Sequence, residues 1–257
     1  MFTKEELKQQ MTAMGLKSTD TVLIHTSFKA VGDVENGPDG FLDAFCEYLS
    51  DGLFLVPTHT WSNVTREQPV YRVDQTIPCI GLIPRTAAFR KDGIRSLHPT
   101  HSIWAHGKNA AGFVTGEELA ETPAPVGFCW SRLADLGAKI LLIGVDNHNN
   151  TFIHSIDERA GLDDRLADTP WDVTVIDWDG NRITHPFRNH GRTGSDNFVN
   201  FETPLVALGA QTFGRLGNAA VRIVDAKRCQ DVILKIYSRT SEHLCLTRRE
   251  IPEALWK

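Results

Sequence analysis

Three apolar segments, each followed by a polar loop rich in histidine, hydroxyl or amide residues, constrain the fold of this chain more than any other feature. They cover residues 21–24, 52–56 and 139–145, and a helical pattern over residues 40–49 stands between the first two. Apolar strands that alternate with helices are typical of an α/β domain. Ligands of such domains bind beyond the carboxyl ends of the strands. The sequence therefore predicts a functional site built from these loops.

The rest of the chain predicts a single-domain α/β sandwich over residues 1–257, with a central mixed β-sheet flanked by helices. Alternating β-formers around Asp179 and Gly180 predict a β-hairpin in the C-terminal half, within a β-rich insertion at about 171–197. Residues 66–80 show no strong periodicity and are predicted to form a long surface loop, which would act as a lid. Helices are predicted over residues 3–16, 81–89, 108–115, 130–136, 151–160, 202–208 and 226–238, the first with a Thr3–Glu6 capping box.

Composition limits the partners that the protein can have. Twenty-seven basic and 32 acidic residues leave a net charge of −5, which argues against nucleic acid as a partner and is compatible with a cationic substrate. The five cysteines are widely spaced and form no CxxC pair, as expected of reduced thiols in a cytoplasmic protein. No apolar run is long enough to span a membrane, so we expect no membrane anchor.

The strongest candidate for catalysis is His154, in the predicted helix that follows the third strand. Asp157 and Glu158 lie three and four residues later, on the same helical side as the imidazole. An imidazole beside a carboxylate is what a general base held in one tautomer requires. Asn149 or Asn150 is expected to cap the helix. The alternative is that the three side chains form a solvated helix face.

Two further loops carry chemistry-bearing residues. His25, Thr26 and Ser27 end the first strand, where backbone N–H groups of a turn can bind a phosphate or pyrophosphate. Ordinary turn chemistry is the more common explanation of such a loop. His98 and His101 flank Pro99, and they could ligate a metal, line a binding wall or border a strand. The chain has no nucleophile elbow, no phosphate-binding GxxxxGK[ST] loop and no GxGxxG motif. This favours a mechanism in which the protein supplies a base and two substrates supply the remaining groups.

Taken together, these stretches resemble the aminoglycoside 3-N-acetyltransferase family. The matching motifs are HTSFKAVG at 25–32, VPTHT at 56–60, RSLHPTHSIWAHG at 95–107, LLIGVDNHNNTFIHSIDE at 141–158 and GRLGNAAVRIVDA at 214–226. The similarity extends over roughly residues 5 to 240. It implies the antibiotic N-acetyltransferase type of α/β fold and a cytoplasmic enzyme of antibiotic resistance. Its expected reaction is direct transfer of an acetyl group from acetyl-CoA to the 3-amino group of an aminoglycoside, without a metal.

The resemblance also implies a role for individual residues. His154 is the expected general base, and Asp157 stands where the family has glutamate, with Glu158 beside it. As further catalytic or CoA-binding residues it implies His25, Thr26, Ser27, Phe28, Ser96, His98 and Ser102. As residues that line the site of the cationic acceptor it implies His101, Asp146, Asp157, Glu158 and Glu202.

Three alternatives remain open at this point. The acceptor could be another amine metabolite, because His101 stands where antibiotic-modifying members often have an aromatic or apolar residue. A metal-dependent hydrolase could use histidines as ligands, namely His25, His59, His98, His101 and His154. The chain could also be a CoA-binding protein without catalytic activity. No partner beyond the two small molecules is expected, and the protein would be a monomer or a homodimer.

Overall fold

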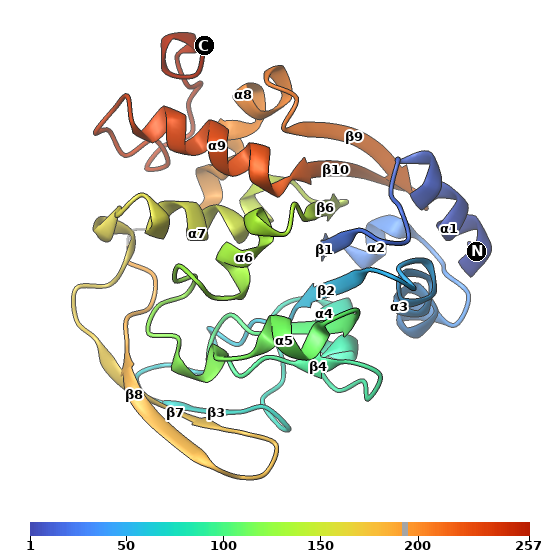
Figure 1. Cartoon of the computed structure of the whole chain (residues 1–257), viewed down its shortest axis with the longest axis horizontal. Coiled ribbons are helices and arrows are strands. Elements are labelled where there is room, and N and C mark those ends of the chain that lie inside the picture. Colours follow the sequence, from blue (N-terminus) through green and yellow to red (C-terminus); the bar gives the residue numbers. More distant parts are fainter. Residues whose placement is uncertain (192–194) are drawn as a thin grey trace.

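A seven-stranded mixed sheet forms the centre of the protein (Figure 1). The computed structural model describes residues 1–191 and 195–257, without the side chain of Asp163. In spatial order the strands are β4 (Ile94–Arg95), β5 (Ile103–Gly107), β2 (Leu53–Pro57), β1 (Thr21–Thr26), β6 (Lys139–Ile143), β10 (Ala219–Asp225) and β9 (Gln211–Leu216). The predicted α/β architecture with a central mixed sheet is confirmed.

β1 lies at the point where the order of the sheet reverses. It pairs in parallel with β2 on one side and with β6 on the other, whereas all strands farther out are antiparallel to their neighbours. The carboxyl ends of β1, β2 and β6 therefore meet at one edge of the sheet. A crevice at such a reversal is where open α/β sheets bind ligands.

Helices cover both faces of this sheet (Figure 1). They are α1 (Lys4–Ala13), α2 (Phe28–Val31), α3 (Gly37–Tyr48), α4 (Leu82–Ala87), α5 (Ala110–Val114), α6 (Cys129–Asp135), α7 (Phe152–Arg159), α8 (Glu202–Ala207) and α9 (Ala226–Tyr237). The predicted capping box of α1 is present, because Thr3 and Glu6 each accept a hydrogen bond from the backbone of the other. None of the helices in the described part of the chain is long and apolar enough to cross a membrane.

The core consists of two apolar layers, one on each face of the sheet. Along β6, Ile140 and Leu142 pack with α5 to α9, while Leu141 and Ile143 pack on the opposite side with α1, α3 and α4. This alternation follows from the two-residue period of a strand. Because both faces of β6 are buried from Ile140 to Ile143, this part of the strand is apolar, as its sequence predicted.

A second, three-stranded sheet lies apart from the first (Figure 1). The predicted hairpin forms β7 (Trp171–Ile176) and β8 (Arg182–Phe187), and β3 (Val70–Arg72) pairs in parallel with β7. The second sheet is therefore not built from the predicted insertion at 171–197 alone, and residues 192–194 of that range lie outside the described residues.

The long surface loop predicted over residues 66–80 is present only in part, because the segment contains the strand β3 and is held to the main sheet. Besides the pairing of β3, the buried guanidinium of Arg95 donates hydrogen bonds to the carbonyl oxygens of Val73 and Thr76. These contacts hold the segment against β4 because a buried guanidinium needs acceptors for its donors. A sequence without periodicity could not reveal partners that lie about 20 residues away or farther.

Candidate active site

A cleft of about 300 Å³ opens at the carboxyl ends of β1, β2 and β6. Its lining consists of Ile24, His25, Thr26, Val56, Pro57, His59, Trp61, Ile80, Gly81, Ile83, Pro84, His101, Val145, His148, Asn149, Thr151, His154, His190 and Ser195. The three loops that the sequence singled out thus contribute to one site. Gly144 allows the loops after β1 and β6 to approach, because its φ is +68° and an added Cβ would lie 2.5 Å from Cβ of Ala30.

Histidine rings form a contiguous cluster in the cleft. The ring centroid of His154 lies 3.9 Å from that of His190 and 4.8 Å from that of Phe198. His190 Nε2 shares a hydrogen bond of 3.2 Å with His101 Nε2, and the ring of His59 lies 4.7 Å from that of His101. The cluster joins four segments that are far apart in the sequence.

Burial holds these imidazoles in their neutral form. It lowers the pKa of His25 to about 3, and the pKa values of His59, His101 and His154 also lie well below the ordinary value. For His154, desolvation is the main cause, followed by the neighbouring His190. A neutral imidazole has a free lone pair, so His154 is able to accept a proton at neutral pH.

Several polar atoms around the cleft are buried and have no hydrogen-bond partner. They are His25 Nε2, Thr26 Oγ1, His59 Nε2, His154 Nδ1 and His190 Nδ1. Buried polar groups in proteins are nearly always paired, so an accumulation of unpaired ones in a cleft points to a site that a ligand completes. This accumulation marks the cleft as the functional site.

The predicted contact between His154 and an acid of its own helix is wrong. Asp157 accepts a hydrogen bond of 2.6 Å from the Tyr237 hydroxyl and lies 3.7 Å from the buried guanidinium of Arg165. Glu158 instead accepts hydrogen bonds from Thr122 Oγ1 and the backbone N–H of Ala124. Each acid turns toward partners on another segment.

Both carboxyl groups are affected by burial. It raises the pKa of Asp157 and that of Glu158 to about 7, and the hydrogen bonds of each group oppose this rise.

The helix α7 also begins differently from the prediction, which placed a capping asparagine before it. Thr151 is its N-cap residue without a side-chain hydrogen bond, and Asn150 donates to Asn147 Oδ1.

Most of the predicted CoA-binding residues do not line the cleft. His25 and Thr26 line it, whereas Phe28 packs in the core against Phe41 and Ser27 is absent from the lining. The polar atoms of the remaining residues are used internally: Ser96 Oγ accepts from the N–H of Ile103, Ser102 Oγ donates to the carbonyl of Thr58, and His98 Nδ1 accepts from the N–H groups of Thr100 and His101. Of these side chains, His98 bonds to the backbone of His101, which does reach the cleft.

Two acids expected around the acceptor also point elsewhere. Asp146 caps the short 3₁₀ turn Asn147–Asn149 by accepting from the N–H of His148. Glu202 forms an ion pair with Arg222, at 2.6 Å. Neither belongs to the lining of the cleft. A local sequence cannot show which cation or N–H group a carboxylate will meet after folding.

Sequence reasoning missed His190 and Trp61 as residues of the site. His190 follows β8 in a polar segment that has no recognisable pattern, and it reaches His154 only through the tertiary fold. Trp61 follows β2 and is 45% exposed at the cleft. Its position after the PTHT loop was the only available signal.

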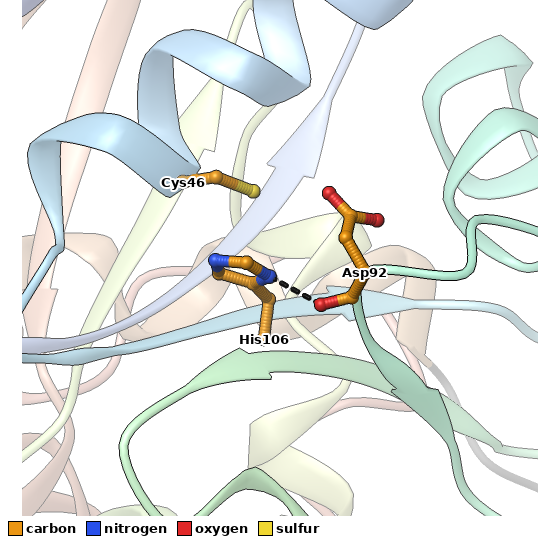
Figure 2. Close-up of side chains that lie close together, drawn as sticks. All are labelled: Cys46, Asp92 and His106. Atoms are coloured by element: carbon orange, nitrogen blue, oxygen red, sulfur yellow. Dashed lines mark hydrogen bonds between the residues drawn. The ribbon is translucent and has the colours of Figure 1, made fainter.

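The histidines of the cleft do not converge on a common point in the described part of the chain. There, one group of metal-binding residue types has its ligand atoms within 4.8 Å of one another, namely Cys46, Asp92 and His106, none of which lines the cleft (Figure 2). His106 Nδ1 donates to the carbonyl of Asp92, and Arg90 donates to both carboxylate oxygens of Asp92. The carboxylate oxygens of Asp92 therefore already accept hydrogen bonds from Arg90, and its carbonyl oxygen accepts one from His106.

Comparison with known proteins agrees with the motifs. The sequence model of aminoglycoside 3-N-acetyltransferases matches residues 23–238. The aminoglycoside N(3)-acetyltransferase VII of Streptomyces paromomycinus is 27% identical over 234 residues, which cover 84% of this chain and 79% of the relative.

Solved structures share the fold. A variant of aminoglycoside acetyltransferase AAC(3)-IVa in complex with a gentamicin superposes with a TM-score of 0.82 at 22% identity, covering 100% of this chain and 94% of the other. AAC-IIIb in a binary complex with CoASH superposes with a TM-score of 0.75 at 22% identity, covering 90% and 94%. Because the family model covers most of the sequence, the chain belongs to the aminoglycoside 3-N-acetyltransferase family.

Proposed function

We propose that this protein is an acetyl-CoA-dependent N-acetyltransferase in which His154 is the general base. The observation that carries this proposal is a neutral, buried imidazole that lines a cleft at the carboxyl ends of three adjacent strands. His25 of β1 and His190 beyond β8 line the same cleft, so the chain acts as one catalytic domain. Family membership supports the reaction type.

In this mechanism the two substrates meet beside His154. The lone pair of the acceptor amine attacks the thioester carbonyl, His154 takes a proton from the nitrogen, and the C–S bond breaks as the CoA sulfur leaves and regains a proton. Thr26 Oγ1, which is unpaired at the end of β1, is suited to donate to the carbonyl oxygen as charge develops on it. Holding both substrates in one cleft adds a proximity effect.

The relatives make the 3-amino group of an aminoglycoside the first candidate for the acceptor. AAC(3)-IVa has been solved with a gentamicin, and the curated relatives are named for this reaction. Acetyl-CoA is the proposed co-substrate, with His25 and Thr26 beside its thioester end.

A second candidate is another amine metabolite that carries fewer positive charges. No carboxylate belongs to the lining of the cleft in the described residues, and none of the three residues at 192–194 is acidic. Cations placed in a cleft without counter-charges lose hydration and gain no ion pair. Asp196 is not part of the lining, and its Oδ1 lies 3.0 Å from Nδ1 of His148.

An acceptor panel separates the two candidates. CoA release would be followed with a thiol reagent for aminoglycosides with and without a free 3-amine, and for small monoamines. If the acceptor is an aminoglycoside, turnover should be confined to aminoglycosides with a free 3-amine. If the acceptor is an amine metabolite with fewer charges, the enzyme should prefer the monoamines. A protein that binds acetyl-CoA and acetylates no amine in either group would contradict the proposal.

Replacement of the acids on α7 tests their predicted role in catalysis. We expect Glu158→Gln to lower kcat far less than loss of His154 does, because Glu158 bonds to Thr122 and Ala124 and makes no hydrogen bond to the imidazole. Steady-state kinetics with a thermal melt of each variant measure both effects. If Glu158→Gln lost as much kcat as a His154 variant and kept its melting temperature, the carboxylate of Glu158 would have to take part in catalysis.

A further inference from the structure

The orientation of His154 requires a cause, because the acids of its own helix bond to other partners. Nδ1 of His154 is buried without a hydrogen-bond partner, while Asp157 accepts from Tyr237 and Glu158 from Ala124. A general base must nevertheless hold its nitrogen within hydrogen-bond reach of the proton that it removes. Packing against neighbouring rings is the contact that remains.

We propose that His190 is the positioning residue of the catalytic base. Its ring lies against that of His154 at 3.9 Å between centroids, tilted by 33°, which is a close contact between ring faces. Phe198 meets the same imidazole with an interplanar angle of 64° at 4.8 Å. Together the two contacts limit the orientations that the ring of His154 can adopt. This inference rests on the proposed function.

His190 is itself fixed in place. Its Nε2 shares a hydrogen bond with His101 Nε2, and His101 Nδ1 is bonded to Thr100 Oγ1 at 2.9 Å. The carbonyl of His101 in turn accepts from Trp130 Nε1, inside the core. A fully buried residue thus anchors the chain of contacts that leads to His154. The orientation therefore comes from the rigid part of the fold.

The contact with His190 also influences when His154 can carry a proton. Desolvation is the main cause of the lowered pKa of His154, and His190, His59 and the guanidinium of Arg165 lower it further, while Asp157 on its own helix is engaged by Tyr237. The ring of His190 contributes to this burial, because it packs on the imidazole at 3.9 Å between centroids. Replacement of His190 by alanine should therefore expose His154 to water and raise its pKa toward the ordinary value.

Two variants separate positioning from a purely structural role. We expect His190→Ala to lower kcat by about 10- to 100-fold with little change in acetyl-CoA affinity, because small misplacements of catalytic groups have effects of this size. His190→Phe, which keeps a ring face, should recover part of that loss. The acid limb of the kcat/KM profile should move to higher pH in His190→Ala, which exposes the imidazole to water, and less in His190→Phe, which keeps it covered. His185→Gln is the matched control, because His185 lies on β8 outside the cleft lining.

A measurement independent of turnover keeps this inference distinct from the proposed function. NMR titration of the His154 imidazole, in the wild type and in His190→Ala, reports the pKa of the base directly. Absence of acetyl transfer in the wild type would refute the proposed function. The positioning role would be refuted by wild-type kcat in His190→Ala, or by an unchanged His154 titration in His190→Ala with its melting temperature preserved.

Discussion

His154→Ala is expected to lower kcat by about 10²–10⁴-fold, the contribution of an oriented general base. An amine that attacks a thioester must lose a proton, and no other side chain of the cluster both lines the cleft and follows the third parallel strand. The affinity for acetyl-CoA should remain nearly unchanged, because the proposed thioester contacts are made by His25 and Thr26. Stopped-flow or steady-state kinetics and equilibrium binding of CoA measure the two effects separately.

Two controls sharpen this experiment. His154→Gln preserves a polar side chain next to His190 and Phe198 but provides no base, so its kcat should be as low as that of His154→Ala. Because burial lowers the pKa of His154, the acid limb of the wild-type kcat/KM profile should lie below pH 6.5. Collapse of CoA affinity with an unchanged kcat would show that His154 binds the cofactor and is not the base.

The second large effect concerns stability in acid. Desolvation lowers the pKa values of six histidines in the folded protein, namely His25, His59, His98, His101, His154 and His190. In the unfolded chain they bind protons as the pH falls below about 6.5. Their contribution to stability is complete above that pH and is lost progressively as the pH falls toward about 3, where His25, His98 and His190 titrate in the folded state.

Three carboxyl groups act in the opposite direction. Burial raises the pKa values of Glu117, Asp157 and Glu158 to about 7, so their contribution is complete below about pH 4 and decreases as the pH rises to about 7. Near pH 5 the six histidines carry protons only in the unfolded chain, whereas the three carboxyl groups carry them mainly in the folded protein. The unfolded state therefore binds about three more protons than the folded state. The free energy of unfolding should therefore fall by about 4 kcal/mol per pH unit on acidification there.

Urea unfolding at intervals between pH 4.5 and 7.5 measures this slope. His98→Gln should reduce it by about one proton, because the replacement removes a buried group that titrates only in the unfolded chain. His148→Gln serves as a control, since that ring is 46% exposed. A free energy of unfolding that stays constant from pH 4.5 to 7.5 would show that the histidine cluster admits water or protons without unfolding.

The positions of the main elements could be predicted from the sequence because they depend on local periodicity. The apolar run at β6, the capping box before α1 and the hairpin around Gly180 each specify their structure within about ten residues. The convergence of the loops after β1, β2 and β6 also follows from the sequence, since parallel strands place their carboxyl ends at one edge. His25 and His154 were identified for this reason.

Only the tertiary structure decided the partners of the polar side chains. The helical spacing of His154, Asp157 and Glu158 allowed a contact within α7. In the fold, however, Tyr237 and Thr122 donate hydrogen bonds to the two acids from distant segments, and the guanidinium of Arg165 lies 3.7 Å from Asp157. The ring of His190 meets His154 for the same reason, although 36 residues separate them in the sequence. A buried polar group that has no partner destabilises the fold, so burial selects these pairings. Burial depends on the whole fold and cannot be read from a local pattern.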